Sequence, residues 1–250
     1  MRLLTLRILA ILLALMTSQL TRAADYAREK KWADEITPGI VVGDPVYLEL
    51  KQGRKFLGIF TEAGNAKDGE EKLGIVVVHG IGIHPDWNMI GTLRTELAEY
   101  GYTTLSIQMP VLANDAQSAA YKPLFPEAAQ RIAVAVDYLQ ARGYNKIAIV
   151  SHSLGSAMSH GYVLKNSSKL TGWASLGMQT YDYAGIGIPV LDLYGERDLP
   201  PVLKKAHRRA ASLKGMPKAR QVKLAGSDHF FTGHEAEMVQ EVKTFLDSIR

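Results

Sequence analysis

The pentapeptide Ser-His-Ser-Leu-Gly at residues 151–155 is the feature that most constrains the fold of this chain. It follows an apolar, β-branched run at residues 146–150 and precedes a segment with helical character. A serine at a sharp turn between a buried strand and a helix exposes its hydroxyl at the end of a sheet, and so tight a turn requires small flanking residues. Ser151 and Gly155 meet this requirement, although glycine is commoner at the position of Ser151. The sequence therefore predicts that Ser153 is a nucleophile at a strand-to-helix turn.

Strands and helices alternate along most of the chain. A hairpin of alternating apolar and polar residues is predicted over residues 45–50 and 54–61, after a polar segment, residues 25–36, that forms a short helix or arm. The six further strands expected are residues 73–78, 103–108, 146–150, 170–176, 188–194 and 220–224. The helices expected among and after them are residues 87–100, 127–142, 154–165, 201–213 and 235–249.

This alternation predicts the fold class. Strands separated by helices of 10–15 residues build βαβ units, and βαβ units build a parallel sheet. We expect one α/β domain over residues 24–250, with a mostly parallel eight-stranded sheet and helices on both of its faces. The connection after Leu176 has about a dozen residues, too few for a large cap domain. The site around Ser153 is therefore expected to be open.

Residues 1–23 have the pattern of a secretory signal peptide. Arg2 and Arg7 precede a short apolar core at residues 8–16, and Thr21 and Ala23 provide small residues before a cleavage point. The alternative is an uncleaved anchor, but the apolar run is shorter than the ~20 residues that a membrane-spanning helix needs. We expect cleavage after Ala23, no stable membrane anchor afterwards, and a periplasmic or secreted protein of a Gram-negative bacterium.

Charge and cysteine content narrow the classes of function. The whole chain has 29 Lys and Arg against 25 Asp and Glu; without the expected leader, which holds three arginines and no acid, the net charge falls from +4 to +1. This balance indicates no nucleic-acid or anionic-membrane partner. The chain has no cysteine, which excludes disulfides, a cysteine nucleophile and lipid attachment through cysteine. Nothing in the sequence indicates the oligomeric state.

A serine nucleophile needs an imidazole to accept its proton, and the imidazole needs a carboxylate to fix its tautomer. For the acid, we expect Asp198, in the Gly-Glu-Arg-Asp loop that follows the strand at residues 188–194. Asp192 lies inside that strand, and Glu196 is the nearest competitor. The alternative for Asp198 is a structural carboxylate that pairs with Arg197 or caps the next helix.

For the base, we expect His229, in the loop after the last strand. That loop reads Ala-Gly-Ser-Asp-His-Phe-Phe over residues 225–231. His234 is the alternative, but its place at the start of the final helix favours a solvated or structural role. Asp228 is interpreted as an orienting or capping group.

The oxyanion hole of such a site needs two backbone N–H groups aimed at the developing charge. One is expected from Leu154, at the positive N-terminal end of the helix that follows Ser153. The other is expected from Ile81, inside the His-Gly-Ile-Gly loop that begins at His79. We interpret His79 itself as a structural histidine that braces this loop by hydrogen bonds.

Two other readings of polar residues are less favoured. His79, His84 and Asp86, or His229 with His234, do not have the spacing and carboxylates of a metallohydrolase, so no metal and no cofactor is expected. One predicted helix carries a basic face, which we interpret as solvated surface. Its residues are Lys204, Lys205, His207, Arg208 and Arg209.

These motifs together resemble the α/β-hydrolase superfamily over nearly the whole length after residue 23. The match rests on four segments, residues 79–82, 151–155, 195–198 and 228–231, in the chain order nucleophile, acid, histidine that this superfamily uses. Residues 79–87 and 104–110 further resemble an uncharacterised family of exported hydrolase-like proteins of Gram-negative bacteria, which implies no settled substrate. The resemblance implies the α/β-hydrolase fold and a Ser153–His229–Asp198 triad.

The expected function is hydrolysis of a small acyl substrate, first an ester and otherwise a thioester or amide, through an acyl-enzyme. An acyltransferase would use the same residues, and a non-catalytic binding protein could keep the fold. The Trp87 region and the loop from Gln108 to Pro126 are expected to form the substrate wall. Tyr121, Leu124 and Phe125 are candidates for an apolar acyl pocket, with packing of the long loop as the alternative.

Overall fold

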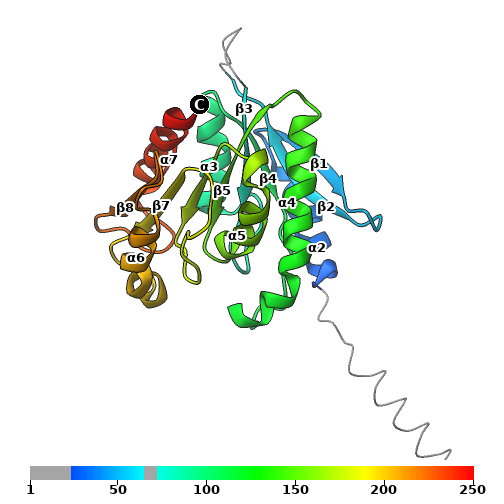
Figure 1. The fold of residues 1–250 in the computed structure, drawn as a ribbon. Helices are drawn as coiled ribbons and strands as arrows, with labels where there is room; N and C mark the ends of the chain where they lie inside the picture. Colours follow the sequence, from blue (N-terminus) through cyan, green and yellow to red (C-terminus); the bar gives the residue numbers. More distant parts are fainter. Residues whose placement is uncertain (1–23, 65–71) are drawn as a thin grey trace, which may run out of the picture.

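One eight-stranded sheet runs through the molecule (Figure 1). The computed structural model describes residues 24–64 and 72–250, so the expected signal peptide lies outside the described residues. The strands are β1 (Asp44–Glu49), β2 (Lys55–Thr61), β3 (Leu73–Val78), β4 (Thr103–Ile107), β5 (Lys146–His152), β6 (Gly172–Leu176), β7 (Val190–Gly195) and β8 (Arg220–Leu224).

The strand order is β1-β2-β4-β3-β5-β6-β7-β8. β2 pairs antiparallel with both β1 and β4, and every other neighbouring pair is parallel. The prediction of a mostly parallel eight-stranded sheet is confirmed, with strand boundaries within a few residues of the expected ones.

Helices cover both faces of the sheet. They are α2 (Tyr26–Ile36), α3 (Asn88–Glu99), α4 (Phe125–Gln140), α5 (Leu154–Asn166), α6 (Pro200–Ser212) and α7 (Glu235–Ile249). Within the described ranges, no helix combines the length and apolar character needed to cross a membrane. The sequence left the loop before α4 without regular structure, but Ser118–Leu124 forms a short 3-10 helix that leads into α4.

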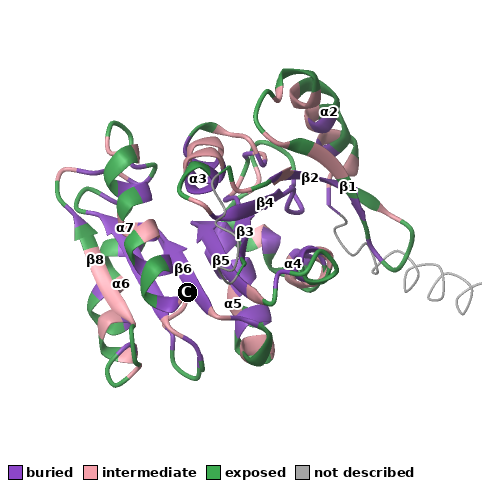
Figure 2. Ribbon diagram, turned by 90° about the horizontal axis from the view of Figure 1, so that it is seen from above, coloured by how far each residue is buried: buried purple, intermediate pink, exposed green. Residues whose placement is uncertain are grey.

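The alternation of side chains along β5 separates two hydrophobic cores. Ile147 and Ile149 belong to the core that includes α4 and α5, whereas Ala148 and Val150 belong to the core that includes α3 and α7. Because β5 is buried on both faces, its sequence is continuously apolar rather than alternating. Figure 2 shows the central strands as buried, with helices of mixed buried and exposed residues around them.

The parallel strands β3 to β8 all end at the same edge of the sheet, which is where α/β proteins place their ligand sites. The loops after β3, β5, β6, β7 and β8 therefore lie together at this edge. Ser153, Asp198 and His229 lie in three of these loops.

Candidate active site

Ser153 occupies a strained turn between β5 and α5. Its backbone has φ 55° and ψ −121°, a conformation that non-glycine residues rarely adopt and that occurs at functional sites. A β-carbon on Gly155 would overlap the carbonyl oxygen of His79, so this position requires glycine. Ser151 is accommodated because its hydroxyl lies 3.0 Å from that of Ser156 and accepts a 2.8 Å hydrogen bond from the Trp173 indole.

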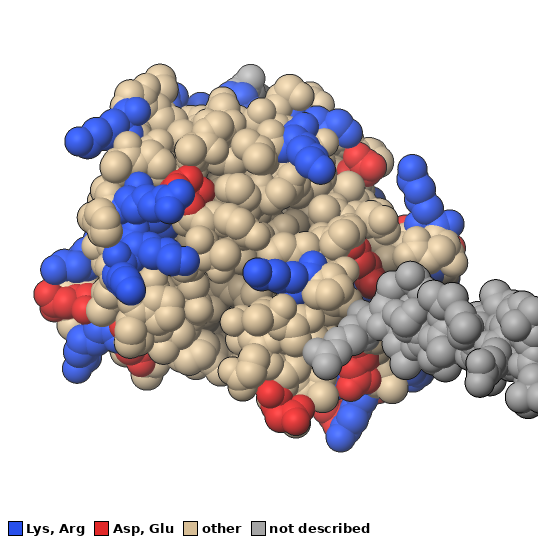
Figure 3. All heavy atoms as spheres, turned by 60° about the horizontal axis from the view of Figure 1, so that its bottom comes forward, with Lys and Arg blue, Asp and Glu red and all other residues tan. Residues whose placement is uncertain are grey.

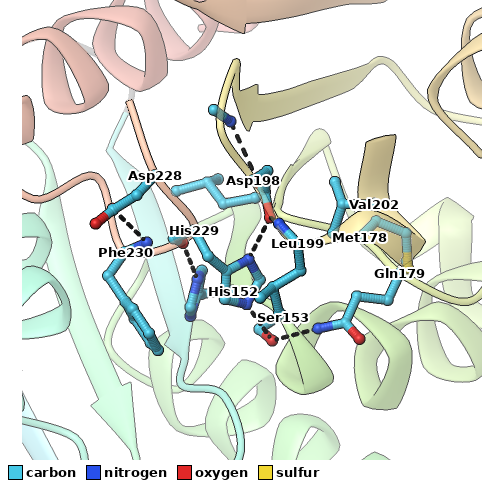
Figure 4. Close-up of polar contacts among 12 residues, drawn as sticks. His152, Ser153, Met178, Gln179, Asp198, Leu199, Val202, Asp228, His229 and Phe230 are labelled. Atoms are coloured by element: carbon cyan, nitrogen blue, oxygen red, sulfur yellow. Dashed lines mark hydrogen bonds and ion pairs between the residues drawn. The ribbon is translucent and has the colours of Figure 1, made fainter. Parts of the chain in front are cut away.

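The structure brings Ser153, His229 and Asp198 together in one hydrogen-bonded series (Figure 4). His229 Nδ1 lies 2.6 Å from Asp198 Oδ1, and His229 Nε2 lies 2.8 Å from Ser153 Oγ. An ionised Asp198 only accepts, so it fixes the proton of His229 on Nδ1. Nε2 is then free to accept the hydroxyl proton of Ser153.

The loop after β7 fixes the Asp198 carboxylate. Oδ1 accepts a 2.6 Å hydrogen bond from the Leu199 amide, and Oδ2 accepts a 3.2 Å hydrogen bond from the Gly195 amide. A β-carbon on Gly195 would overlap the carbonyl oxygens of Ser227 and Asp228. The loops that carry Asp198 and His229 are therefore packed backbone to backbone.

The competing acids for the triad lie elsewhere. Asp192 is fully buried and accepts hydrogen bonds from Arg209 at 2.9 Å and from Tyr183 at 2.7 Å. Glu196 is exposed and accepts from the Gly226 amide at 3.0 Å. Neither carboxylate has a hydrogen bond to His229, so of the acids considered only Asp198 has the geometry of an orienting carboxylate.

The other two polar groups of this region have the structural positions expected for them. Asp228 Oδ1 accepts hydrogen bonds from the amides of Phe230 at 2.9 Å and Thr232 at 3.0 Å, so it caps the turn that carries His229. His234 lies at the start of α7, 3.7 Å from Glu237.

The loop after β3 lies directly against the Ser153 turn. A β-carbon on Gly80 would stand 3.1 Å from Ser153 Cβ. His79 braces the loop, because its Nδ1 donates to the Gly80 carbonyl at 2.8 Å and its Nε2 accepts from the Met109 amide at 2.9 Å. Burial lowers the pKa of His79 to about 3, which keeps the ring neutral and Nε2 able to accept.

Gln179, which the sequence analysis did not single out, also contacts Ser153. Its Nε2 donates a 3.2 Å hydrogen bond to Ser153 Oγ. Because the Oγ proton is directed to His229, the oxygen has only acceptor capacity left, and an amide N–H satisfies it. The sequence does place Gln179 just after the strand β6, at the carboxyl edge of the sheet where ligand sites lie, and this position could have indicated it as a site residue.

The residues on both sides of Gln179 contact α6 and α5. Arg209 donates to the Met178 carbonyl at 2.9 Å, and Lys205 donates to the Thr180 carbonyl at 3.2 Å. The Tyr181 ring stacks on His160 with 4.4 Å between ring centroids. The Gln179 side chain is therefore presented to Ser153 from a fixed backbone.

His152 is a second residue that sequence reasoning missed. It is fully buried behind His229, with 4.8 Å between the ring centroids, and its Nε2 lies 2.9 Å from the His229 carbonyl oxygen. Burial lowers the pKa of His152 to about 3. The neutral ring donates from Nε2 and supports the backbone of His229.

The proposed substrate wall divides into two groups. Trp87 packs edge-on against Phe230, with 5.3 Å between ring centroids, and Phe230 is 40% exposed beside His229. Tyr121 and Leu124 lie instead in the core beneath α4, where the Tyr121 hydroxyl accepts from the Leu112 amide at 3.0 Å. Phe125 packs against the same core. This burial favours the packing alternative for residues 121–125.

The basic face of α6 corrects one interpretation. Lysine and arginine side chains gather over α6 in Figure 3, and Lys204 and Arg208 are exposed as expected. Arg209 is not solvated surface: it is fully buried and forms an ion pair with Asp192 at 2.9 Å. The helical spacing turns this one cation toward β7, where a buried carboxylate compensates its charge.

The residues considered for a metal site are engaged separately. Asp86 forms an ion pair with Arg94 at 2.5 Å, and His84 Nδ1 accepts from the Asp86 amide at 3.3 Å. Across residues 24–64 and 72–250, no three His, Asp or Glu side chains converge in a way that could hold a metal ion.

Comparisons with known proteins agree with this architecture. Est1E from Butyrivibrio proteoclasticus is similar in structure, with a TM-score of 0.63 and 16% identity, covering 82% of this chain and 98% of that one. Dienelactone hydrolase from Anabaena variabilis gives a TM-score of 0.66 and 17% identity, covering 82% and 96%. The chain has the α/β-hydrolase fold. Ser153, Asp198 and His229 follow β5, β7 and β8, which is the chain order of nucleophile, acid and histidine in this fold.

Sequence comparisons add two further similarities. Residues 44–128 match a family described as proteins of unknown function, DUF3530. The putative protein-lysine deacylase ABHD14B of Rattus norvegicus is 26% identical over 178 residues, which are 68% of this chain and 80% of that protein. The human protein of the same description is 26% identical over 169 residues, 64% of this chain and 76% of that protein.

Proposed function

We propose that the protein is a serine hydrolase that cleaves a carboxylic ester through an acyl-enzyme intermediate. The observation that carries this proposal is the series of hydrogen bonds from Asp198 through His229 to Ser153 Oγ, at 2.6 Å and 2.8 Å. A serine hydroxyl paired with an oriented imidazole is the arrangement that activates serine for attack on a carbonyl.

In the acylation step, Ser153 Oγ forms a bond to the substrate carbonyl carbon while its proton moves to His229 Nε2. The Asp198 carboxylate stabilises the imidazolium that results. The carbonyl oxygen becomes an oxyanion that accepts from the Ile81 and Leu154 amides. When the intermediate collapses, the bond to the leaving group breaks and the leaving oxygen takes the proton from His229.

In the deacylation step, His229 takes a proton from water, the resulting hydroxide attacks the acyl carbon, and Ser153 leaves with the proton that His229 returns. The same two amides hold the second oxyanion. Their role is supported by the fact that both amides are unpaired: within the described residues neither the Ile81 nor the Leu154 amide has a hydrogen-bond acceptor. An unpaired amide beside the nucleophile is preorganised for developing negative charge.

In this proposal Gln179 is a third hydrogen-bond donor, directed at Ser153 Oγ and not at the carbonyl oxygen of the substrate. Its amide stabilises negative charge on Ser153 Oγ as the proton leaves. This hydrogen bond makes deprotonation less costly without changing how His229 is oriented.

Exposed apolar side chains that follow β7 and β8 support an uncharged acyl or alcohol group as substrate. Phe230, Leu199 and Leu203 are 40%, 41% and 38% exposed, and Phe230 contacts Trp87. An N-acyl-lysine amide is the second candidate, because a relative of 26% identity is described as a putative protein-lysine deacylase. On the pattern of residues 1–23 we further propose that the enzyme works in the periplasm or outside a Gram-negative cell.

The test is covalent labelling of the purified protein by a fluorophosphonate, read by intact mass. Wild type is expected to gain one adduct, and Ser153→Ala and His229→Ala to gain none. Ser168→Ala, at an exposed serine after α5, is the matched control and should label like wild type. Absence of labelling in folded wild type would contradict the proposal and favour a binding protein. If wild type is labelled, hydrolysis of nitrophenyl esters with and without added alcohols would separate a hydrolase from an acyltransferase.

A further inference from the structure

A cavity of about 410 Å³ lies between α2 and the β1–β2 hairpin, and Ser153 is not among its lining residues. The rings of Tyr26, Tyr47 and Phe56 contribute to its wall together with the side chain of Leu57. Its volume is in the range of pockets that bind small molecules. In Figures 1 and 2, α2 lies beside β1 and β2, at the edge of the sheet away from α6.

The helix that covers the cavity is fixed to the body of the protein. Glu29 and Arg131 form a buried ion pair at 2.9 Å, and the Tyr26 hydroxyl donates to Glu127 at 2.7 Å. Removing either partner of a buried ion pair is strongly destabilising. The cavity is therefore a formed space between fixed elements.

One cation that lines the cavity, Arg54, forms no ion pair within the described residues. Both acids of the lining are occupied, Glu29 by Arg131 and Asp34 by Lys30 at 2.6 Å. Arg54 stacks on the Tyr26 ring, 3.2 Å from its centroid, and its buried Nε has no acceptor among the described residues. Stacking leaves the edge of a guanidinium available, and that edge matches a carboxylate.

Gln108 supplies a second orphaned polar atom in the lining. It is 1% exposed, and its Nε2 donates to the Met109 carbonyl at 2.8 Å. Its buried Oε1 has no donor within the described part of the chain. A buried acceptor without a partner costs about 1–3 kcal/mol, which a ligand hydroxyl would recover.

We propose that this cavity is a second ligand site, which binds a small aromatic carboxylate that also carries a hydroxyl group. The carboxylate pairs with Arg54, the ring packs among Tyr26, Tyr47 and Phe56, and the hydroxyl donates to Gln108. The site does not depend on the chemistry of Ser153.

The test is calorimetric titration of the whole protein with 4-hydroxybenzoate as the probe. Wild type and Ser153→Ala are expected to bind one equivalent with equal affinity, and benzoate is expected to bind more weakly. Arg54→Met should weaken binding by about tenfold or more, as expected for a hydrogen bond to a charged group. The matched control is Arg142→Met, because Arg142 also stacks on a tyrosine, Tyr138, at 3.5 Å but outside the cavity.

Four outcomes would overturn the proposal. These are no binding to folded wild type at millimolar probe, equal binding by Arg54→Met, equal binding of neutral 4-hydroxybenzyl alcohol, and benzoate binding as tightly as 4-hydroxybenzoate. Saturating probe should also leave the rate of fluorophosphonate labelling at Ser153 unchanged. A slower rate would place the probe at the triad, whereas failure of labelling itself would count only against the proposed hydrolase function.

Discussion

Gly177 lies so close to His229 that a β-carbon on it would stand 2.9 Å from Cε1 and 3.1 Å from Nδ1 of the imidazole. Its φ of +62° is also one that only glycine adopts without strain. The backbone after β6 is thus one wall of the space that holds the histidine, and the position of the ring depends on the absence of a side chain at residue 177.

Gly177→Ala is therefore expected to displace His229 and to lower kcat/KM for an ester substrate by about 10- to 100-fold, because small misplacements of catalytic groups are costly. The control is Gly185→Ala, which also has a positive φ, +80°, but faces only the Leu164 side chain at 3.3 Å. Both variants should lose more than about 1 kcal/mol of stability, because a positive φ is unfavourable for alanine. Equal activity of the two would contradict the contact as the cause.

Gln179→Ala is expected to lower kcat by about tenfold or more with little change in KM, because the hydrogen bond to Ser153 Oγ strengthens as charge develops on that oxygen. Steady-state kinetics with a nitrophenyl ester would measure both constants. Thr180→Ala changes the exposed neighbour and is the control. A rise in KM at unchanged kcat would instead assign Gln179 to substrate binding.

The adjacent arginines of α6 should differ sharply in their effect on stability. Arg209→Met leaves Asp192 buried without its cation and is expected to cost about 3–5 kcal/mol. Arg208→Met breaks a pair in which the arginine side chain is 74% exposed and should cost less than about 1 kcal/mol. Urea unfolding of both variants gives the comparison. Similar costs would show that burial does not set the strength of these pairs.

Acid should destabilise the fold through His152. Burial lowers its pKa to about 3, whereas in the unfolded chain the pKa is about 6.5. Between these values the unfolded state binds a proton that the folded state does not, so the free energy of unfolding falls as pH falls, by ~1.4 kcal/mol per pH unit for one group.

His152→Gln keeps a donor for the His229 carbonyl and should reduce this slope by that amount. Urea unfolding at several pH values from 7 to 4 measures it, with the exposed His207→Gln as control; an unchanged slope would contradict the prediction.

The strands and the main candidate site residues were predictable because their signals are local. The apolar run before Ser153 and the small residues around it specify a strand-to-helix turn, and the loops that carry Asp198 and His229 follow strands of clear apolar pattern. Gln179 was missed because its role depends on which strand neighbours β5, which is a property of the sheet order. Arg209 was misread because a run of cations does not show which member turns inward toward Asp192.

Tyr121 and Leu124 are a second case in which the sequence alone did not predict where a side chain points. An aromatic or aliphatic residue in a long loop can belong either to a substrate wall or to the core. Residue type alone does not tell which of the two it contacts. The 3-10 helix of Ser118–Leu124 turns both side chains into the core beneath α4. Such short helices are set by tertiary contacts more than by local propensity.

The backbone contacts of Gly155 and Gly195 have a consequence for how this site can diversify. At each position any side chain would collide with main-chain atoms of a neighbouring loop, so the inner framework around Ser153 offers no room for gradual change. Leu199, Leu203 and Phe230 are exposed, so a different side chain at these positions would meet solvent. Substitutions around Ser153 are therefore expected to be tolerated at these exposed positions, one residue at a time, whereas the glycine positions beneath them admit no other side chain.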